Sequence, residues 1–493
     1  MPPGASATGL TLPQARTYLS QITENPAEKA SIQMRVSGLF LALALALAPV
    51  AHAQQRVPVS QAELQLSFAP VVRKTAPAVV NIYASWVTER RASPFANDPF
   101  FSQFFDGFTQ ATPRVQNSLG SGVIVDAGGI VVSNYHVVQE ARDIRVVLAD
   151  RREFAGEVLL SDREADIAVI RLEDAEGLPA LDFADSDLAQ VGDLVLAIGN
   201  PFGVGQTVSS GIVSATARTG AATRQSSGYF LQTDAPINPG NSGGALVDMQ
   251  GRLVGLNTSI LTRSGGSNGI GFAIPANLVA QYVDQAKAGN DRFQRPWSGL
   301  SVQEVDGGIA HALGQQVPAG VLVSDLHPES PFARAGIRTG DVILAIDGFA
   351  VNAADALDYR LVTLGIGTEA EVDLLRDGAQ QRVRVALAEA PGGDATPVQI
   401  GGRSLLAGLV VADVTPRLIE EMDLPMSTSG VIVLRSEGPS VRLGLRPGDV
   451  IRSLNGDAFE DAASLQRELR GGARLREMEF SRGEQILRLR LHG

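Results

Sequence analysis

The chain carries the run Gly240-Asn241-Ser242-Gly243-Gly244, in which one serine is enclosed by glycines. Only one histidine, His136, lies between residues 54 and 300, and it precedes this run. A serine hydroxyl becomes a useful nucleophile when an imidazole accepts its proton and a buried carboxylate orients that imidazole. Asp166 stands directly before an apolar run and is the candidate carboxylate. We expect these three side chains to form a hydrolytic site.

The order of the three residues along the chain indicates the fold. Serine hydrolases reach one geometry with several chain orders, and His136, Asp166, Ser242 is the order of the chymotrypsin arrangement. Short β-branched runs broken by Gly, Asn and Asp fill residues 67–275, which is typical of a barrel or a sandwich. We therefore predict a mainly β protein that begins with a chymotrypsin-like double β-barrel.

The glycines near the serine suit an oxyanion hole. Such a hole needs backbone N–H groups that converge on one point, in a conformation that bulky side chains would block. In the oxyanion segment 240–242, which includes Asn241, we expect Gly240 and Ser242 to be the donors. Gly243 and Gly244 are expected to let the substrate approach closely.

The composition narrows the class of protein. The chain has 493 residues, of which 44% are hydrophobic, 19% are charged and 52 are glycine. At about 150 residues per domain, this length predicts about three domains, and the glycine content favours turn-rich β structure. A formal charge of −12 argues against nucleic acid or an anionic membrane as the main partner, since both need a basic face. The absence of cysteine excludes a disulfide framework and thiol catalysis.

The N-terminal region has the pattern of an export signal. A basic start at Met34-Arg35 precedes the apolar run 39–50 and Ala51-His52-Ala53, which is an A-x-A cleavage signature. We expect a cleavable signal peptide at residues 34–53 and a non-native upstream extension at residues 1–33. The alternative is an uncleaved membrane anchor, which the shortness of the apolar run disfavours.

The C-terminal half contains an internal repeat. The stretch 330–343 returns as 439–451, and glycines keep one constant offset between the copies, as Gly340 and Gly448 do. Two copies of one small domain are therefore expected. The expected domains are a protease domain at 54–290 and the two repeat copies at 297–390 and 401–493.

Three stretches resemble the catalytic blocks of the HtrA (DegP/Do-like) serine proteases. They are Ser133-Asn134-Tyr135-His136-Val137, Ala165-Asp166-Ile167-Ala168-Val169 and the run 233–244. The repeat resembles two PDZ domains, so from about residue 68 to the C-terminus the chain is similar to the two-PDZ type. The resemblance implies an ATP-independent periplasmic serine endopeptidase that degrades misfolded or unfolded proteins, with PDZ domains that bind peptides and regulate activity. It also implies a homotrimer, and it allows larger cages and an added chaperone activity.

The resemblance assigns further residues around the nucleophile. Pro236 stands where trypsin-like enzymes carry an aspartate for basic side chains, so with Ile237 and Asn238 it implies a substrate-binding pocket for a small aliphatic side chain. Asn241 replaces the aspartate that pairs with a new N-terminus in trypsin-like zymogens, which implies activation by loop rearrangement. Arg218 matches the family arginine that relays peptide binding to the catalytic loops, and the alternative is a solvated surface charge.

Other segments are expected to move or to make contacts. By resemblance, the mobile loops are the stretch after residue 214 and the stretch 259–269. The aromatic run 99–108 places four phenylalanines on one face of a short helix. This face either packs on its own barrel or, by resemblance, contacts neighbouring subunits or caps the active site.

The repeat copies are expected to bind an extended peptide as an added strand, with its carboxylate held by backbone N–H groups. In the first copy the carboxylate loop is Gly299-Leu300-Ser301-Val302, where Ser301 replaces the usual third glycine. In the second copy the stretch 408–411 fits more loosely, so this copy is a candidate for a role in assembly.

We expect no metal ion or other cofactor, because one histidine and no cysteine in the protease region leave no ligand cluster of recognisable spacing. The expected partners are unfolded or misfolded proteins and C-terminal peptides, with no nucleic acid and no membrane insertion after leader cleavage. Two other functions stay open. One is a regulatory protease that cuts a specific signalling substrate, and the other is a non-enzymatic chaperone or peptide-binding scaffold.

Overall fold

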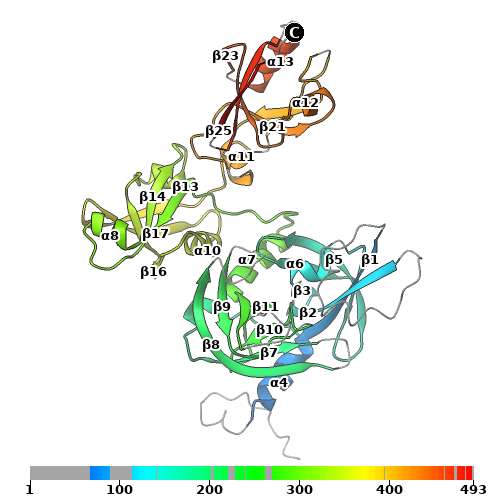
Figure 1. Cartoon of the computed structure of the whole chain (residues 1–493). Helices are drawn as coiled ribbons and strands as arrows, with labels where there is room; N and C mark the ends of the chain where they lie inside the picture. Colours follow the sequence, from blue (N-terminus) through cyan, green and yellow to red (C-terminus); the bar gives the residue numbers. More distant parts are fainter. Residues whose placement is uncertain are drawn as a thin grey trace, which may run out of the picture. The chain divides into compact units, whose positions relative to one another are not determined.

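The strands of the computed structural model form two closed barrels and two further sheets (Figure 1). The structure describes residues 67–88, 114–139, 141–200, 205–219, 228–238, 240–260, 269–393, 395–402, 404–422, 424–459, 461–470, 475–483 and 485–490. The expected extension, the signal peptide and the aromatic run 99–108 lie outside these residues. So do 220–227 and 261–268 of the loops expected to be mobile.

The first barrel closes in the strand order β1-β2-β3-β6-β5-β4. Its strands are β1 (Val79–Thr88), β2 (Arg114–Asp126), β3 (Ile130–Ser133), β4 (Asp143–Val147), β5 (Glu153–Asp162) and β6 (Ile167–Leu172). Burial alternates along β4, as a strand with one face in water requires, whereas β3 is buried throughout. The short helices α4 (Ala69–Thr75) and η1 (Ala76–Ala78) precede β1.

The second barrel closes in the order β10-β11-β12-β9-β8-β7. Its strands are β7 (Leu194–Gly199), β8 (Thr207–Thr219), β9 (Tyr229–Thr233), β10 (Ala245–Val247), β11 (Leu253–Ile260) and β12 (Gly271–Pro275). Helix α7 (Ala276–Lys287) follows β12 and buries Val279, Tyr282, Val283 and Ala286 on one face, at the spacing of an amphipathic helix. The predicted fold class, a chymotrypsin-like double barrel at the start of a mainly β protein, is confirmed.

The third sheet has the order β13-β14-β15-β17-β18, with β16 paired to β15. Its strands are β13 (Leu300–Glu304), β14 (Val321–Leu326), β15 (Val342–Ile346), β16 (Phe349–Ala350), β17 (Glu369–Arg376) and β18 (Ala379–Ala386). Its helices are α8 (Gly307–Ala312), α9 (Pro331–Arg334) and α10 (Ala354–Leu364).

The fourth sheet repeats this plan with one extra strand at its start, in the order β19-β20-β21-β22-β24-β25 with β23 paired to β22. Its strands are β19 (Val398–Gln399), β20 (Leu409–Asp413), β21 (Val431–Ser436), β22 (Val450–Leu454), β23 (Asp457–Ala458), β24 (Glu477–Arg482) and β25 (Gln485–Arg490). Its helices are α11 (Pro416–Glu421), α12 (Pro439–Arg442) and α13 (Ala462–Arg470).

Each repeat copy contains the same ion pair between a buried aspartate and an arginine. Asp341 of the first copy is buried and pairs with Arg376, whose Nη2 lies 2.6 Å from Oδ2. Asp449 of the second copy pairs in the same way with Arg482, at 2.7 Å from Nε. A buried carboxylate needs such a partner to stay charged, so each copy contains the aspartate and its arginine together.

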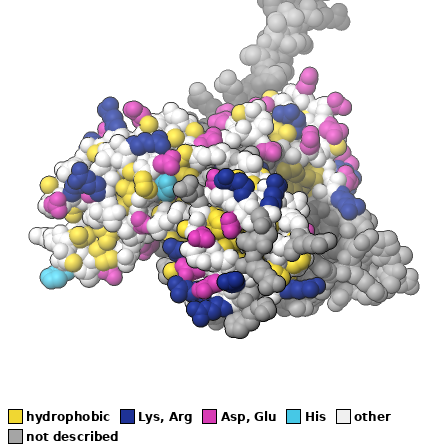
Figure 2. Space-filling view, turned by 90° about the horizontal axis from the view of Figure 1, so that it is seen from above, with side chains coloured by type: hydrophobic (Ala, Val, Ile, Leu, Met, Phe, Trp, Pro, Cys, Tyr) yellow, Lys and Arg dark blue, Asp and Glu magenta, His cyan; other side chains and the backbone are white. Residues whose placement is uncertain are grey.

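The surface carries both signs of charge. On the face in Figure 2, basic and acidic side chains are interspersed over the described residues, without one large region of a single sign. Within the described part of the chain, no helix is both long and apolar enough to cross a bilayer.

Candidate active site

His136 lies in a one-turn helix, α6 (Tyr135–Val138). β3 ends three residues earlier, at Ser133, and the chain turns there to carry the imidazole out of the barrel. Nδ1 of His136 lies 2.8 Å from Oδ2 and 2.9 Å from Oδ1 of Asp166. The imidazole is 43% exposed, whereas the carboxylate is only 16% exposed. A substrate can therefore reach the histidine, and the acid is shielded behind it.

Asp166 occupies the last position of the turn between β5 and β6, with a φ of 55°. Aspartate tolerates this left-handed conformation better than most residues. The backbone N–H of His136 also donates to Oδ1, at 3.0 Å, and the amide of Asn134 donates to the carbonyl oxygen of Asp166, at 2.9 Å. These contacts fix both the backbone and the carboxylate of Asp166.

Thr258, on β11 of the second barrel, connects the acid to the serine. Its hydroxyl donates to Oδ2 of Asp166 at 2.7 Å, and its carbonyl oxygen accepts from the hydroxyl of Ser242 at 2.9 Å. Ser242 and Asp166 are thus both within hydrogen-bond reach of one residue. A serine hydroxyl has one proton to donate, so in this arrangement the proton goes to Thr258 and not to His136.

The segment around the serine is a tight turn. The N–H of Asn241 donates to the carbonyl oxygen of Asn238 at 2.9 Å, and Gly240 has a φ of 95°. The hydroxyl of Ser121 donates to the carbonyl oxygen of Gly240 at 2.6 Å and accepts from the N–H of Asn200 at 2.8 Å. The hydrogen bond from Ser121 to the carbonyl oxygen of Gly240 fixes the orientation of the turn.

The glycines after the serine have a different role from the one expected. A Cβ on Gly243 would overlap the carbonyl oxygen of Ser121, and one on Gly244 would overlap the carbonyl oxygen of Ile198. Both glycines are buried. Gly243 lets the chain pack against the backbone of the first barrel, and Gly244 lets it pack against β7 of the second barrel, so the expectation that they admit the substrate is wrong.

Asn241, the residue before the serine, is 1% exposed and lies against Gly199, which has no room for a Cβ. A buried carboxylate at this place would need a cationic partner, whereas a neutral amide is buried at lower cost. The burial gives a physical reason for asparagine here.

The expected substrate-binding residues lie between β9 and β10. Pro236 and Asn238 are exposed, whereas Ile237 is 1% exposed and packs in the core of the second barrel over Gly271. The carbonyl oxygen of Pro236 accepts from the hydroxyl of Ser209 at 2.6 Å. In this state the aliphatic side chain contacts the barrel.

Arg218 lies in β8, where its backbone is opposite Phe230 of β9 in the antiparallel register. Its side chain is outside the described residues, so the relay role stays a prediction. Among the described residues, no group of three or more His, Cys, Asp or Glu could hold a metal ion.

Comparison with known families agrees with this geometry. Residues 120–256 match the family model of the trypsin-like peptidase domain, and residues 298–387 match that of the PDZ domain. The periplasmic serine endoprotease DegP of Escherichia coli (strain K12) is 35% identical over 481 residues, which cover 92% of this chain and 98% of that protein.

The chain belongs to the HtrA family of DegP-type serine endoproteases. A probable periplasmic DegP-like serine endoprotease of Pseudomonas fulva is also 35% identical, covering 88% of this chain and 92% of that protein. Among solved structures, the HtrA-type protease AlgW with a decapeptide is 38% identical, with a TM-score of 0.48, and covers 66% of this chain and 99% of that chain. This HtrA protein is a serine endopeptidase with PDZ domains.

The first PDZ copy of this HtrA protein leaves its peptide edge open. Leu300 begins β13, and β13 is the end strand of its sheet among the described residues. The carbonyl oxygen of Gly299 accepts from the N–H of His327, while Ser301 and Val302 pair with β14. An extended peptide could therefore pair with the other side of β13, beside α10, which contacts this strand.

The second PDZ copy has its corresponding edge occupied by the chain itself. β19 pairs antiparallel with β20, with Val398 opposite Val411 and Gln399 opposite Val410. The N–H of Ile400 donates to the carbonyl oxygen of Leu409, and α13 contacts both β19 and β20. β19 thus lies where a peptide would add.

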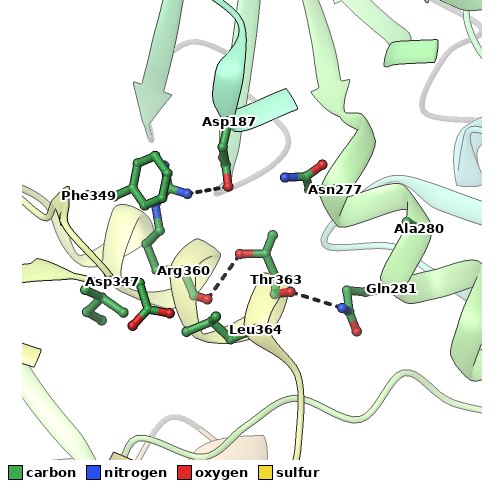
Figure 3. Close-up of a pocket in the computed structure, with 10 residues that line it drawn as sticks. Asp187, Asn277, Ala280, Gln281, Asp347, Phe349, Arg360, Thr363 and Leu364 are labelled. Carbon is green, nitrogen blue, oxygen red and sulfur yellow. Dashed lines mark hydrogen bonds and ion pairs between the residues drawn. The ribbon is translucent and has the colours of Figure 1, made fainter. Parts of the chain in front are cut away.

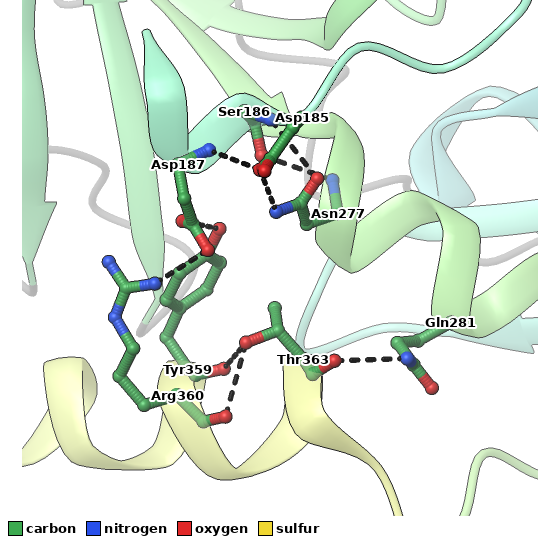
Figure 4. Close-up of polar contacts among 8 residues, drawn as sticks. All are labelled: Asp185, Ser186, Asp187, Asn277, Gln281, Tyr359, Arg360 and Thr363. Carbon is green, nitrogen blue, oxygen red and sulfur yellow. Dashed lines mark hydrogen bonds and ion pairs between the residues drawn. The ribbon is translucent and has the colours of Figure 1, made fainter. Parts of the chain in front are cut away.

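Helix α10 of the first PDZ copy also contacts the second barrel (Figures 3 and 4). Arg360 is 9% exposed and pairs with Asp187 of η2 (Ser186–Leu188), with Nη1 2.7 Å from Oδ2. The hydroxyl of Tyr359 donates to Oδ1 of Asp187 at 3.1 Å, and its ring stacks on Tyr229 at the start of β9. Burial is the main cause that raises the pKa of Tyr359, and the negative charge of Asp187 raises it further, so the hydroxyl of Tyr359 stays protonated and donates a hydrogen bond. A cleft of about 270 Å³ lies beside this ion pair.

The sequence predicts His136, Asp166 and Ser242, which the structure connects through Thr258, but it does not predict the parts played by Thr258 and Ser121. Both act through hydrogen bonds to residues more than 90 positions away. A threonine in a β-strand has no local pattern that distinguishes it, so no sequence signal could have found it.

We predict that Thr258→Val lowers kcat about tenfold, because it removes a hydrogen bond to a charged carboxylate. The matched control is Thr258→Ser, which keeps the hydroxyl and should stay near wild type. Both variants keep the backbone carbonyl that accepts from Ser242. Steady-state cleavage of a fluorogenic peptide measures the effect, and an unchanged kcat in the valine variant would mean that this hydroxyl does not hold Asp166.

Proposed function

We propose that the protein is an ATP-independent endopeptidase of the periplasm that degrades misfolded or unfolded proteins. Ser242 is the nucleophile, His136 the general base and Asp166 the residue that orients His136. The contact of Thr258 with both Asp166 and Ser242 carries this proposal, because it brings an acid of one barrel and a hydroxyl of the other to one place.

In the proposed reaction the Ser242 oxygen attacks the carbonyl carbon of the substrate, and its proton passes to Nε2 of His136. The imidazolium is stabilised by Asp166, which accepts from Nδ1. The N–H groups of Gly240 and Ser242 bind the oxyanion of the tetrahedral intermediate. The proton then goes to the leaving amine, and water hydrolyses the acyl-enzyme by the same route.

The reaction needs one rearrangement. The hydroxyl of Ser242 has to leave the carbonyl of Thr258 and turn to His136 before it can be activated. This supports a resting state that substrate binding converts into the active one, in line with activation by loop rearrangement. Pro236, Ile237 and Asn238 are uncharged, which supports a preference for a substrate with a small aliphatic side chain at the cleaved bond.

The location and assembly are part of the proposal. The named relatives are periplasmic, and residues 34–53 have the composition of a cleavable leader. A homotrimer follows from the family resemblance, and light scattering of the full mature chain tests it. A monomer with and without unfolded substrate would contradict it.

The two PDZ copies have different proposed roles. The first binds C-terminal peptides at β13 through the loop Gly299-Leu300-Ser301-Val302. The second does not bind peptides in the resting state, because β19 covers its edge. Regulation through Arg218 rests on the family resemblance, and α10 offers a contact from the first copy to the start of β9.

We predict that wild type digests casein to a broad peptide ladder, whereas Ser242→Ala leaves it intact although it folds normally. The serine hydroxyl is the only group in this mechanism that forms the acyl bond. Gel electrophoresis and mass spectrometry of the products measure this. Cleavage only after addition of a particular peptide would favour a regulatory protease, and no cleavage by either form would favour a scaffold.

We predict that Ile400→Pro opens the second PDZ copy. Proline lacks the N–H that bonds to Leu409, so β19 should leave β20. In a calorimetric titration with a hydrophobic C-terminal peptide, the number of bound peptides per subunit should rise from one to two. The control Val317→Pro changes an exposed residue outside both edges and should keep one site.

We predict that Arg360→Met reduces the change in kcat/KM that a bound peptide produces, while casein cleavage without peptide changes less. The substitution removes the buried pair with Asp187. Arg382→Met, which removes an exposed pair with Asp373 in the same domain, is the control. An undiminished peptide response in Arg360→Met would exclude this contact from the regulation.

A further inference from the structure

Asp162, four residues before Asp166, is the centre of a cluster outside the candidate triad. Its Oδ1 accepts from the backbone N–H of Glu164 at 2.7 Å and of Ala165 at 3.2 Å. Its Oδ2 accepts from the hydroxyl of Tyr282 at 2.7 Å and from Nη2 of Arg295 at 2.8 Å. One carboxylate therefore joins the turn that ends in Asp166 to two other parts of the chain.

Those two parts are helix α7 and the segment that connects it to the first PDZ copy. Tyr282 of α7 stacks on Phe293, with ring centroids 3.7 Å apart. The side chain of Gln285 donates to the carbonyl oxygen of Gln294 and accepts from its N–H. The connecting segment is thus fixed to α7 on the residues immediately before Arg295.

Arg295 binds the turn at two places. In addition to Asp162, its Nη1 pairs with Glu164 at 2.9 Å. Two residues later the backbone N–H of the buried Trp297 donates to the carbonyl oxygen of Ala388, at the end of the first PDZ copy. Arg295 therefore contacts the turn shortly before the chain enters the first PDZ copy.

The charges in this cluster depend on one another. Asp162 has only 15% of its side chain exposed. Burial raises its pKa, but the charge of Arg295 and the hydrogen bond from Tyr282 outweigh burial, and the net pKa lies below the usual value. Without Arg295, the buried carboxylate would lose its cation and the turn would lose a rigid attachment.

The turn is too short to lose its attachment to Arg295 without moving Asp166. Asp162 and Ile167 are opposite each other in the β5–β6 pair, so only residues 163–166 lie between the paired positions. A shift of the turn therefore moves Asp166 directly. Because proton transfer depends on a correctly placed imidazole, a displacement of about 1 Å can cost about 100-fold in rate.

We propose that Arg295 is a positioning residue for the catalytic carboxylate: through Asp162 it holds the turn of Asp166 in place and ties it to the segment that leads to the first PDZ copy. The inference rests on the proposed function, in which Asp166 orients His136. Arg295 is not assigned a contact with substrate; it acts through the turn, mainly at the buried Asp162 and also at Glu164.

The test compares Arg295→Met with Arg295→Lys in the full mature chain, at a temperature well below the melting point of each. Methionine keeps the length of the side chain but removes the charge, and we expect kcat to fall about 10- to 100-fold with KM changed less than about twofold. Lysine should restore a large part of kcat. Inactivation by a small fluorophosphonate, which needs no peptide site, should slow in parallel.

A double-mutant cycle shows whether Arg295 acts through Asp162. In the Asp162→Asn background, Arg295→Met should produce a clearly smaller loss than in wild type, because only the more exposed pair with Glu164 is left to remove. Tyr282→Phe keeps the ring stack and should give a smaller decrease in kcat of the same kind. Arg145→Met is the matched control, because it removes an exposed ion pair with Glu153 at the other end of β5, and it should leave kcat unchanged.

The outcomes separate this inference from the proposed function. If Asp166→Asn is strongly impaired and Arg295→Met retains the wild-type kcat, the positioning role is wrong and the triad stands. If Asp166→Asn retains full activity, the triad itself is wrong. Additive losses in the cycle, or an equal loss in Arg145→Met, would also overturn the role of Arg295.

Discussion

The hydrogen bond from Thr258 to Asp166 is the contact on which the active site depends. It crosses from the second barrel to the first, and its length is 2.7 Å. His136 and Asp166 belong to the first barrel and Ser242 to the second, so neither barrel holds the site alone. Gly243 also contributes to this boundary, because without a side chain it lets the chain approach the backbone of Ser121 in the first barrel. The chemistry is therefore a property of the boundary between the barrels.

The double barrel and the choice of His136, Asp166 and Ser242 could be predicted because few alternatives existed. One histidine in the region fixed the base, and chain order selected the fold. The roles of Gly243 and Gly244 were misjudged, since glycine permits close approach but the sequence does not say what approaches. Thr258 and Ser121 could not be found, because their functions come from partners that only the closed barrels bring near.

The difference between the two PDZ copies could also not be predicted from the sequence. The repeat can be read directly from the sequence, including Asp341 and the corresponding Asp449. The second carboxylate loop fits the peptide-binding pattern only loosely. The physical difference lies in β19, a strand of two residues that precedes the second copy. A strand this short has no periodicity to detect, yet it changes an open edge into a paired one.

The strand β19 also determines how tightly a free peptide must bind to occupy the second copy. A segment tethered close to its own groove competes at an effective concentration on the order of millimolar. A free peptide at micromolar concentration would have to bind far more tightly than β19 to displace it. Weak, abundant chain ends would thus leave the second copy closed, and only a strong ligand or a high local density of unfolded chains could open it.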